Sequence, residues 1–478
     1  MSRLLQLIRL PQNLFYLISA IILIVNVSLI VNGFFWLAWM LPVLLILAIF
    51  FVFSLDNVLF FIVLSTPLAL NLEDVFPKLS LSFPTEPLLA ALLLVFIIKL
   101  IIGQVPERRV FSHPIVIAVT LYLGWMLITS FTSQYPIVSF KYFIARLWFV
   151  VPMLLMITPL FKDLRKVHIF YWLYMASFCV VIIYTTYNHA GYGFSEKGAN
   201  WAMSPFFNDH TAYGVMLAFF IPILTGLCLT KIYTSGMRIV SFIVLIVFIT
   251  ALILSYCRAA WISLGVSFLV MIPILLKIRM RWLILVFAVL VGIYYSYQQQ
   301  IIDKLEKNKQ ESSANYTQHI ESMLNVSSDA SNLERLNRWK CALRLFHEHS
   351  QLGWGPGTYQ FAYGPYQLNR EKTIISTNEG DRGNAHSEYL GPLSESGWPG
   401  LLTVLILFSV IIYSGIRVYQ QAVKPEVRIL SLITLLGFIS YFSHGVMNNF
   451  LDTDKASIPF WGFAAILVAL DLYHKETL

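Results

Sequence analysis

The chain has few charged residues and few cysteines for its 478 residues. Only 12% of the residues are Asp, Glu, Lys or Arg, about half of the roughly 25% found in soluble domains. A soluble core of this size would need a polar shell that this composition does not supply. The cysteines are scattered along the chain and suggest neither a disulfide framework nor a metal site: Cys179, Cys228, Cys257 and Cys341.

Other common signatures are missing as well. Gly353, Gly355 and Gly357 do not form a GxGxxG motif or a P-loop, so no nucleotide site is expected. His347 and His349 lack the spacing of a zinc-binding helix. The net charge of +8 is not a nucleic-acid signal here, because long apolar segments dominate the chain. We expect no cofactor and no metal.

Long apolar runs are what the sequence does contain. Hydrophobic residues make up 58% of the chain, and the mean hydropathy is +0.71. A helix that crosses the bilayer core needs roughly 20 apolar residues, and its backbone polar groups must bond internally. The sequence therefore predicts an all-α polytopic membrane protein with about 12–14 transmembrane helices, at residues 14–32, 34–53, 57–71, 86–103, 113–131, 142–161, 167–187, 210–230, 238–255, 259–278, 281–297, 398–418, 427–447 and 456–472.

The basic residues indicate an orientation. The first apolar run is long and no small-residue cleavage site follows it, so it is interpreted as a membrane helix and not as a cleaved signal. With both termini cytoplasmic, most Lys and Arg residues between spans fall in cytoplasmic segments, as the positive-inside rule requires. The short outer loops then hold only five basic residues, Lys78, Lys141, Lys197, Arg258 and Lys455.

One outer segment is much longer than the others. Residues 298–397 form a loop between an N-terminal bundle of about 11 spans (1–297) and three C-terminal spans (398–478). Long loops of this kind are usually functional or disordered. Within it, residues 331–349 predict an amphipathic helix capped by Ser331 or Asn332. Its apolar side would carry Leu333, Leu336, Trp339, Leu343 and Phe346, and the glycines after it would break it.

The end of this loop is the strongest local feature. It carries a histidine and two carboxylates directly before an apolar run, Asn384-Ala-His386-Ser-Glu388-Tyr-Leu-Gly-Pro-Leu-Ser-Glu395. A histidine can act as a general base if it reaches a substrate hydroxyl. The alternative is a structural histidine that caps or bonds the loop. Glu388 and Glu395 are seven residues apart and would share a helical face, but they are weak candidates for a glycosidase pair.

Further polar residues fall at outer span ends. Arg258 and Arg146 offer planar donors suited to phosphate oxygens, although either is also explained by snorkelling to lipid headgroups. Asn208 and His210 flank Asp209 at a helix start, where Asn or Asp is a normal N-cap. His444 lies at another outer end, where interface bonding would also explain it. The individual signals are loose, but Arg146, His210, Arg258, His386 and His444 all map to the same membrane face.

Three motifs in this order resemble a known family. They are Ser255-x-x-Arg258-x-x-Trp261; then Arg335-x-x-Arg338-Trp339 followed by Leu-Gly-Trp-Gly-Pro-Gly357; and then Ala385-His386-Ser-Glu-Tyr-Leu with Glu395-Ser-Gly397. The set is similar to the O-antigen ligase superfamily of bacterial inner-membrane proteins, over roughly residues 200–450. That superfamily includes the ligases, some repeat-unit polymerases and protein O-oligosaccharyltransferases.

The resemblance implies a reaction on the periplasmic face of the inner membrane. The donor would be a glycan on undecaprenyl pyrophosphate, and the acceptor a glycan hydroxyl, on lipid A-core in ligases. The resemblance assigns the base to His386 and pyrophosphate binding to Arg258. This sequence lacks one arginine that ligases often carry shortly before the motif at Asn208. Lys197 or Arg146 would substitute for that arginine. Asn208, His210, Arg338, Glu388 and His444 would support the site.

Two alternatives remain open at this point. A repeat-unit polymerase would use lipid-linked glycan as both donor and acceptor, and the sequence does not separate it from a ligase. A transporter is the alternative from another class, but transporters often show internal repeats and polar groups in mid-membrane. The sequence has no such repeat, and its polar candidates gather at one face.

Overall fold

The computed structural model describes residues 54–72, 81–104, 107–231, 233–278, 330–372, 376 and 383–475, with residues 25, 27, 28 and 31. The chain divides into two units, Met1–Phe61 and Ile62–Leu478, and the site described below lies within the second. Helices dominate the described residues, and the strands β1 (Leu70–Asn71) and β2 (Ser82–Phe83) pair antiparallel. The shorter helical elements are α4 (Leu55–Ser65), η1 (Thr66–Leu68), α5 (Thr85–Ile101), α6 (Arg108–Phe111), α10 (Glu196–Ala199), α17 (Tyr359–Ala362) and η5 (Gly364–Tyr366).

Nine helices within the described residues are long and apolar enough to cross a membrane. The fold class, an all-α polytopic membrane protein, is thereby confirmed. The nine are α7 (Pro114–Phe131), α8 continuing through η3 and η4 (Pro136–Lys162), α9 (Leu164–Gly191), α11 (His210–Leu229), α12 (Ser235–Leu254), α13 (Arg258–Leu275), α18 (Leu390–Gln421), α19 (Pro425–His444) and α20 continuing through η6 (Asp454–His474).

These nine helices fall on nine of the predicted spans. Their ends differ most at α18, which begins at Leu390 and not at 398. Gly397 breaks the helical geometry there with φ 69°, so the regular membrane segment does start after it. The predicted spans 57–71 and 86–103 coincide with the apolar helix Leu55–Leu68 and with α5. The spans 34–53 and 281–297 lie outside the described residues, as does most of 14–32.

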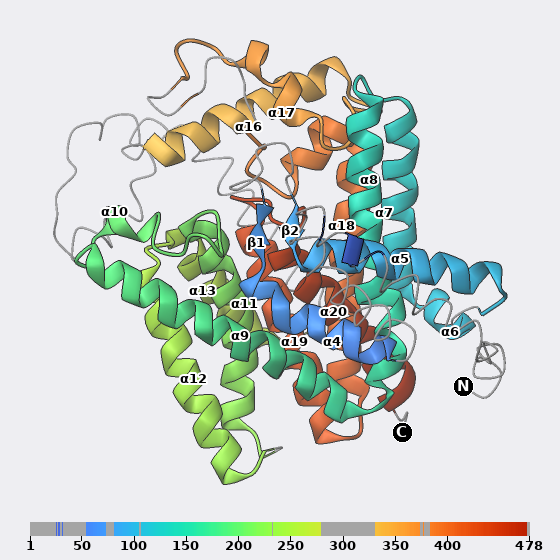
Figure 1. Ribbon diagram of the computed structural model, residues 1–478, viewed down its shortest axis with the longest axis vertical. Coiled ribbons are helices and arrows are strands. Elements are labelled where there is room, and N and C mark those ends of the chain that lie inside the picture. Colours follow the sequence, from blue (N-terminus) through green and yellow to red (C-terminus); the bar gives the residue numbers. More distant parts are fainter. Residues whose placement is uncertain are drawn as a thin grey trace. The chain divides into compact units, whose positions relative to one another are not determined.

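The centre of the second unit is built from α11, α19 and α20. Every residue from Asp454 to Ala469 in α20 is buried, and α11 packs against both α19 and α12 (Figure 1). Aromatic rings fill this centre: Phe219 stacks on Phe463 with ring centroids 4.5 Å apart, and Tyr174 stacks on Phe220 at the same distance. By contrast, α12 exposes a row of apolar side chains, as a helix facing lipid does: Ile239, Phe242, Ile243, Ile246 and Ile253.

Polar contacts join a set of helix ends on one side of this unit. His168 Nε2 at the start of α9 lies 2.9 Å from Glu426 Oε1 at the start of α19. Asp471 near the end of α20 contacts His113 before α7, at 3.1 Å, and Arg417 near the end of α18. These ends therefore share one side, as the predicted alternation of spans requires. That this side is cytoplasmic remains a prediction from the basic residues.

Candidate functional site

The large loop ends its long helix at a glycine-rich turn. Helix α16 (Ala330–Glu348) is followed by Gly353, Gly355 and Gly357, with φ of +69°, +113° and +73°. L-residues with a Cβ rarely adopt such angles, whereas glycine does so readily. The predicted break after the helix is thus confirmed.

This turn fastens the loop to two membrane helices. Gly355 N donates to the Glu395 carbonyl of α18 at 2.7 Å, and Gln134 N, between α7 and α8, donates to the Trp354 carbonyl at 3.0 Å. A Cβ at Gly355 would overlap the side chain of Ser133. The backbone therefore approaches α18 and the α7–α8 turn more closely than any other residue would allow.

The buried face of α16 is polar in its first half and apolar after it, where Cys341, Ala342 and Leu345 are buried. Glu334, Asn337 and Arg338 are all buried, and Arg338 Nε donates to Glu334 Oε1 at 2.9 Å. The Arg338 guanidinium also lies over the Tyr363 ring, 4.7 Å from its centroid, and Asn337 Nδ2 donates to Gln367 Oε1 at 3.1 Å. Because each of these polar groups has a partner, the face is buried without leaving an unpaired charge.

The predicted apolar face of this helix is wrong. Leu336 and Leu343 are 36% and 41% exposed, because the side that packs inward carries Arg338, whose Nη1 donates to the Asn384 carbonyl at 3.4 Å. The predicted cap is wrong too, since the helix begins at Ala330 and so contains Ser331 and Asn332. Spacing alone located the helix but not the side that binds the histidine loop.

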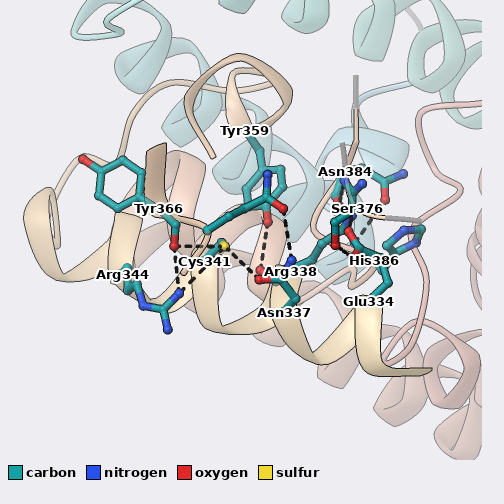
Figure 2. Close-up of polar contacts among 11 residues, drawn as sticks. Glu334, Asn337, Arg338, Cys341, Arg344, Tyr359, Tyr366, Ser376, Asn384 and His386 are labelled. Carbon is teal, nitrogen blue, oxygen red and sulfur yellow. Dashed lines mark hydrogen bonds and ion pairs between the residues drawn. The ribbon is translucent and has the colours of Figure 1, made fainter. Parts of the chain in front are cut away.

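His386 lies directly against α16 (Figure 2). Its backbone adopts φ 47°, an uncommon value for a residue with a Cβ. Three contacts hold this conformation: His386 N donates to Asn384 Oδ1 at 3.1 Å, Trp339 Nε1 donates to the His386 carbonyl at 3.3 Å, and Arg338 bonds the Asn384 carbonyl. Strained residues of this kind cluster at functional sites, and the surrounding structure must support them.

The surroundings of His386 keep its imidazole neutral. Burial, together with the guanidinium groups of Arg338 and Arg335, lowers the pKa of His386 to about 4, while Asp209 and Glu334 partly oppose this shift. Asp209 belongs to the start of α11, so α11, α16 and the histidine loop meet around this ring. At neutral pH the ring is therefore uncharged and holds a lone pair for a proton.

Glu388 joins the histidine loop to the turn between α19 and α20. Its Oε1 accepts from Tyr441 Oη at 2.7 Å, from Phe450 N at 2.8 Å and from Leu451 N at 3.0 Å. Its backbone N donates to the Gly445 carbonyl at 2.8 Å. A carboxylate oxygen with three donors is anchored firmly, so the loop and the α19–α20 turn are fixed to each other.

A cavity of about 400 Å³ opens beside this anchor. Helices α7, α8, α18 and α20 and three loop segments border it. Pockets of roughly 300–1,000 Å³ are usual for small-molecule sites. The chemically distinctive lining residues are Tyr122, Trp125, Tyr142, Arg146, Tyr359, Asn384, Glu388, Glu395, Phe408, Asn449, Asp452 and Trp461.

Three carboxylates and one guanidinium face this cavity. Glu388 and Glu395, which the sequence placed on one helical face, line the same space, although Glu388 precedes α18. Arg146 is buried, donates to the Leu451 carbonyl and donates to Tyr142 Oη at 2.6 Å. Asp452 is exposed and lines the cavity. Partial desolvation there and the Glu388 charge raise its pKa to about 6.

The predicted anion-binding residues Arg258 and Lys197 lie outside this cavity. Arg258, the first residue of α13, bonds Glu196 Oε1 through Nη2 at 3.3 Å, and Lys197 is exposed beside that glutamate. Neither lines the cavity, and neither does His386, although its neighbours Ala385 and Ser387 do. Arg146 and Glu388 thus line the cavity, whereas Arg338 and His386 do not.

The helix-start and helix-end candidates have structural contacts. Asp209 caps α11, accepting at Oδ1 from Thr211 N at 2.7 Å and Ala212 N at 2.8 Å, so the predicted N-cap is confirmed at Asp209. Asn208 is exposed, and His210 is the first helical residue. His444 is buried at the end of α19, with Nε2 3.1 Å from Asn448 Nδ2.

Sequence reasoning missed four residues around this loop. Arg335 acts on His386 although its position was noted only as part of a motif. Asp452, Trp125 and Trp461 line the cavity from three separate elements. Asp452 gave no signal in the sequence, because it precedes the span and only a charge at membrane depth is costly.

The fold and the site together define a polytopic helical membrane protein whose polar candidate site is assembled at one set of helix ends. A comparison with known protein families matches residues 243–405 to the family described as O-antigen ligase. Residues 243–405 are thus similar to an O-antigen ligase domain, a domain type that implies a membrane glycosyltransferase of the O-antigen ligase and polymerase type. The matched stretch includes Arg258, α16, the glycine-rich turn and His386. A search of curated proteins finds no match to this chain.

Proposed function

We propose that this protein transfers a glycan from undecaprenyl pyrophosphate to an acceptor glycan hydroxyl on the periplasmic face of a bacterial inner membrane, as an O-antigen ligase. The observation that carries the proposal is the coincidence of the O-antigen ligase domain with a neutral, arginine-flanked histidine at residue 386. Glycan transfer accounts for this arrangement better than transport does, because the polar groups gather at helix ends and line one loop.

In the proposed reaction, the acceptor oxygen forms a bond to the anomeric carbon of the donor. The bond between that carbon and the pyrophosphate oxygen breaks, and undecaprenyl pyrophosphate leaves with the electron pair. His386 accepts the hydroxyl proton as the new bond forms. No cofactor is required, because pyrophosphate is already a good leaving group.

The low pKa of His386 is compatible with this role. A base with a pKa of about 4 is weak in the free protein. A pyrophosphate bound near Arg335 and Arg338 would neutralise the cations that lower the pKa and add negative charge, and both effects raise it. The base would thereby gain strength only when the donor is bound. Arg258 and Lys197 are proposed to complete the anion site from the adjacent helix starts.

The test is reconstitution of the purified chain in liposomes with undecaprenyl-pyrophosphate glycan. Lipid A-core and a second lipid-linked glycan are offered as separate acceptors, and both product and released lipid are measured. Transfer to lipid A-core supports the ligase; extension of the lipid-linked glycan instead identifies a polymerase. Absence of both products, with the protein correctly inserted, would overturn glycan transfer.

A further inference from the structure

The cavity beside Glu388 has a lining that the proposed pyrophosphate site does not explain. It presents the carboxylates of Glu388, Glu395 and Asp452 and a single guanidinium, Arg146. That guanidinium already bonds the Leu451 carbonyl and Tyr142 Oη. A polyanion placed here would meet more negative than positive charge, in surroundings where such interactions are stronger than in water.

Two polar atoms of the lining lack protein partners. Within the part of the chain that the structure describes, Trp461 Nε1 and Asn449 Oδ1 are buried and have no hydrogen-bond partner, and both residues line the cavity. The Trp461 side chain is fully buried, with 0% exposed. Since buried polar groups are nearly always bonded, these two atoms point to a ligand that both accepts and donates hydrogen bonds.

The remaining lining is aromatic. Tyr122 and Trp125 from α7, Tyr142 from α8 and Phe408 from α18 border the same space. Aromatic faces pack well against the apolar face of a ring whose edge is polar. A sugar ring has these properties: its hydroxyls donate and accept in turn, and its C–H face is apolar.

We propose that this cavity is a binding subsite for an uncharged sugar ring of a glycan substrate, separate from the anion site on the His386 side of the loop. This inference rests on the proposed function and adds a substrate preference to it. In this arrangement, Asp452 accepts a hydrogen bond from one sugar hydroxyl and Asn449 Oδ1 accepts one from a second. Trp461 Nε1 donates a hydrogen bond to a third hydroxyl. An acidic sugar is disfavoured, because its carboxylate would add negative charge beside Glu388 and Asp452.

The subsite is tested by equilibrium binding to the full-length purified chain in nanodiscs. One probe is the soluble oligosaccharide released by mild acid from the lipid-linked glycan of the same cells; the other is farnesyl pyrophosphate. Asp452→Asn and Trp461→Phe should each raise the oligosaccharide Kd by about tenfold, the loss of roughly one hydrogen bond. The farnesyl pyrophosphate Kd should stay within about twofold, since no polar contact to it is removed.

Matched controls separate binding from folding. Trp201→Phe alters an exposed tryptophan outside this cavity and should leave both affinities unchanged. The charge preference has its own probe, the same oligosaccharide oxidised to uronic acids at its primary hydroxyls. The oxidised oligosaccharide should bind the wild type more weakly than the neutral form does. Asp452→Asn should reduce this difference in Kd.

The outcomes distinguish this subsite from the proposed function. Unchanged oligosaccharide affinity in both cavity variants, with normal transfer in liposomes, overturns the subsite and leaves the transfer reaction standing. Loss of farnesyl pyrophosphate binding in Trp461→Phe, with oligosaccharide binding intact, also overturns it, because the cavity would then hold the anion. Oligosaccharide binding that weakens as expected in a protein that transfers no glycan supports the subsite and contradicts the transferase.

Discussion

His386 has a left-handed backbone, a buried ring and two arginines that act on it. None of these properties is a consequence of its being a histidine. They come from Asn384, Trp339 and Arg338, which lie on the loop and on α16. At the scale of single residues, the site therefore depends on contacts between segments far apart in the sequence.

The pH dependence of transfer should reflect the lowered pKa of His386. The base must be neutral to accept a proton, and with a pKa of about 4 it stays neutral well below pH 6.5. The pH profile of kcat/KM reports the pKa values of the free enzyme. We therefore expect protonation of His386 to lower kcat/KM only as the pH approaches 4. The same pH profile should also be measured in Asp452→Asn, because this variant lacks the carboxyl group whose pKa is about 6.

Replacing the histidine tests its role directly. His386→Ala should lower kcat by roughly 10²–10⁴-fold, the usual contribution of a positioned general base. His347→Ala, an exposed histidine on the same loop, is the matched control and should transfer at the wild-type rate. Full transfer by a correctly inserted His386→Ala protein would remove the catalytic assignment.

Asp452 should make stability depend on pH in a definite direction. Its folded pKa of about 6 exceeds the ordinary 3.8, so the fold disfavours the ionised form. The wild type therefore loses stability as pH rises from about 4 through 6, and the deficit persists above that. Asp452→Asn should melt at a higher temperature than the wild type at pH 8 and at the same temperature near pH 3.5. A gap that does not change with pH would contradict the raised pKa.

At the scale of elements, the glycine-rich turn determines how the large loop attaches to the bundle. Gly355 combines a positive φ with close contact to the α7–α8 turn. Gly103 has φ +80° but nothing near the position of a Cβ, so it isolates the cost of the backbone conformation alone.

These two glycines give a matched pair of variants. Gly103→Ala should destabilise by about 1–2 kcal/mol, the cost of a left-handed conformation for an L-residue. Gly355→Ala should cost several kcal/mol more, because the new methyl group overlaps Ser133. Thermal unfolding in detergent measures both, and protease cleavage within 298–397 reports whether the loop has detached. Equal costs would show that the contact with Ser133 is unimportant.

Helix α16 also shows what a single sequence can and cannot predict about an element. Its existence and length were predictable, because Leu and aromatic residues recur at helical spacing. The buried side was not, since Glu334, Asn337 and Arg338 are residues that normally face water. Their burial depends on Gln367, Tyr363 and Asn384, partners that no periodicity reveals.

At the scale of the whole molecule, the bilayer accounts for how much was predictable. A span must be long and apolar whatever it packs against, so eleven of the predicted spans coincide with helices in the described residues, and nine of these helices are long enough to cross a membrane. The cavity was not predictable, because Trp125, Tyr142, Asp452 and Trp461 come from different elements and meet only through helix packing. The grouping of polar residues at helix ends on one predicted face was a usable signal, but it did not show which of them would line the cavity.

The orientation of the molecule is a separate prediction. A single cysteine introduced at Leu352, in the large loop, should react with a membrane-impermeant maleimide in intact spheroplasts. One at Ser235, at the exposed start of α12, should react only after lysis. The background should be low because Cys228, Cys257 and Cys341 are buried, provided that the partly exposed Cys179 is replaced by Ser in both variants. The reverse pattern would place the candidate site on the cytoplasmic face.

The three donors on Glu388 have a consequence for the order of events during turnover. Glu388 lies on the segment that contains His386. Its carboxylate accepts from the backbone N–H groups of Phe450 and Leu451, the two residues before Asp452. The proposed base His386 and the proposed sugar contact Asp452 therefore lie on two segments that Glu388 joins by hydrogen bonds. Because Glu388 bonds both segments, we expect a displacement of either one to be transmitted to the other, so that the two substrates would be aligned by a shared support.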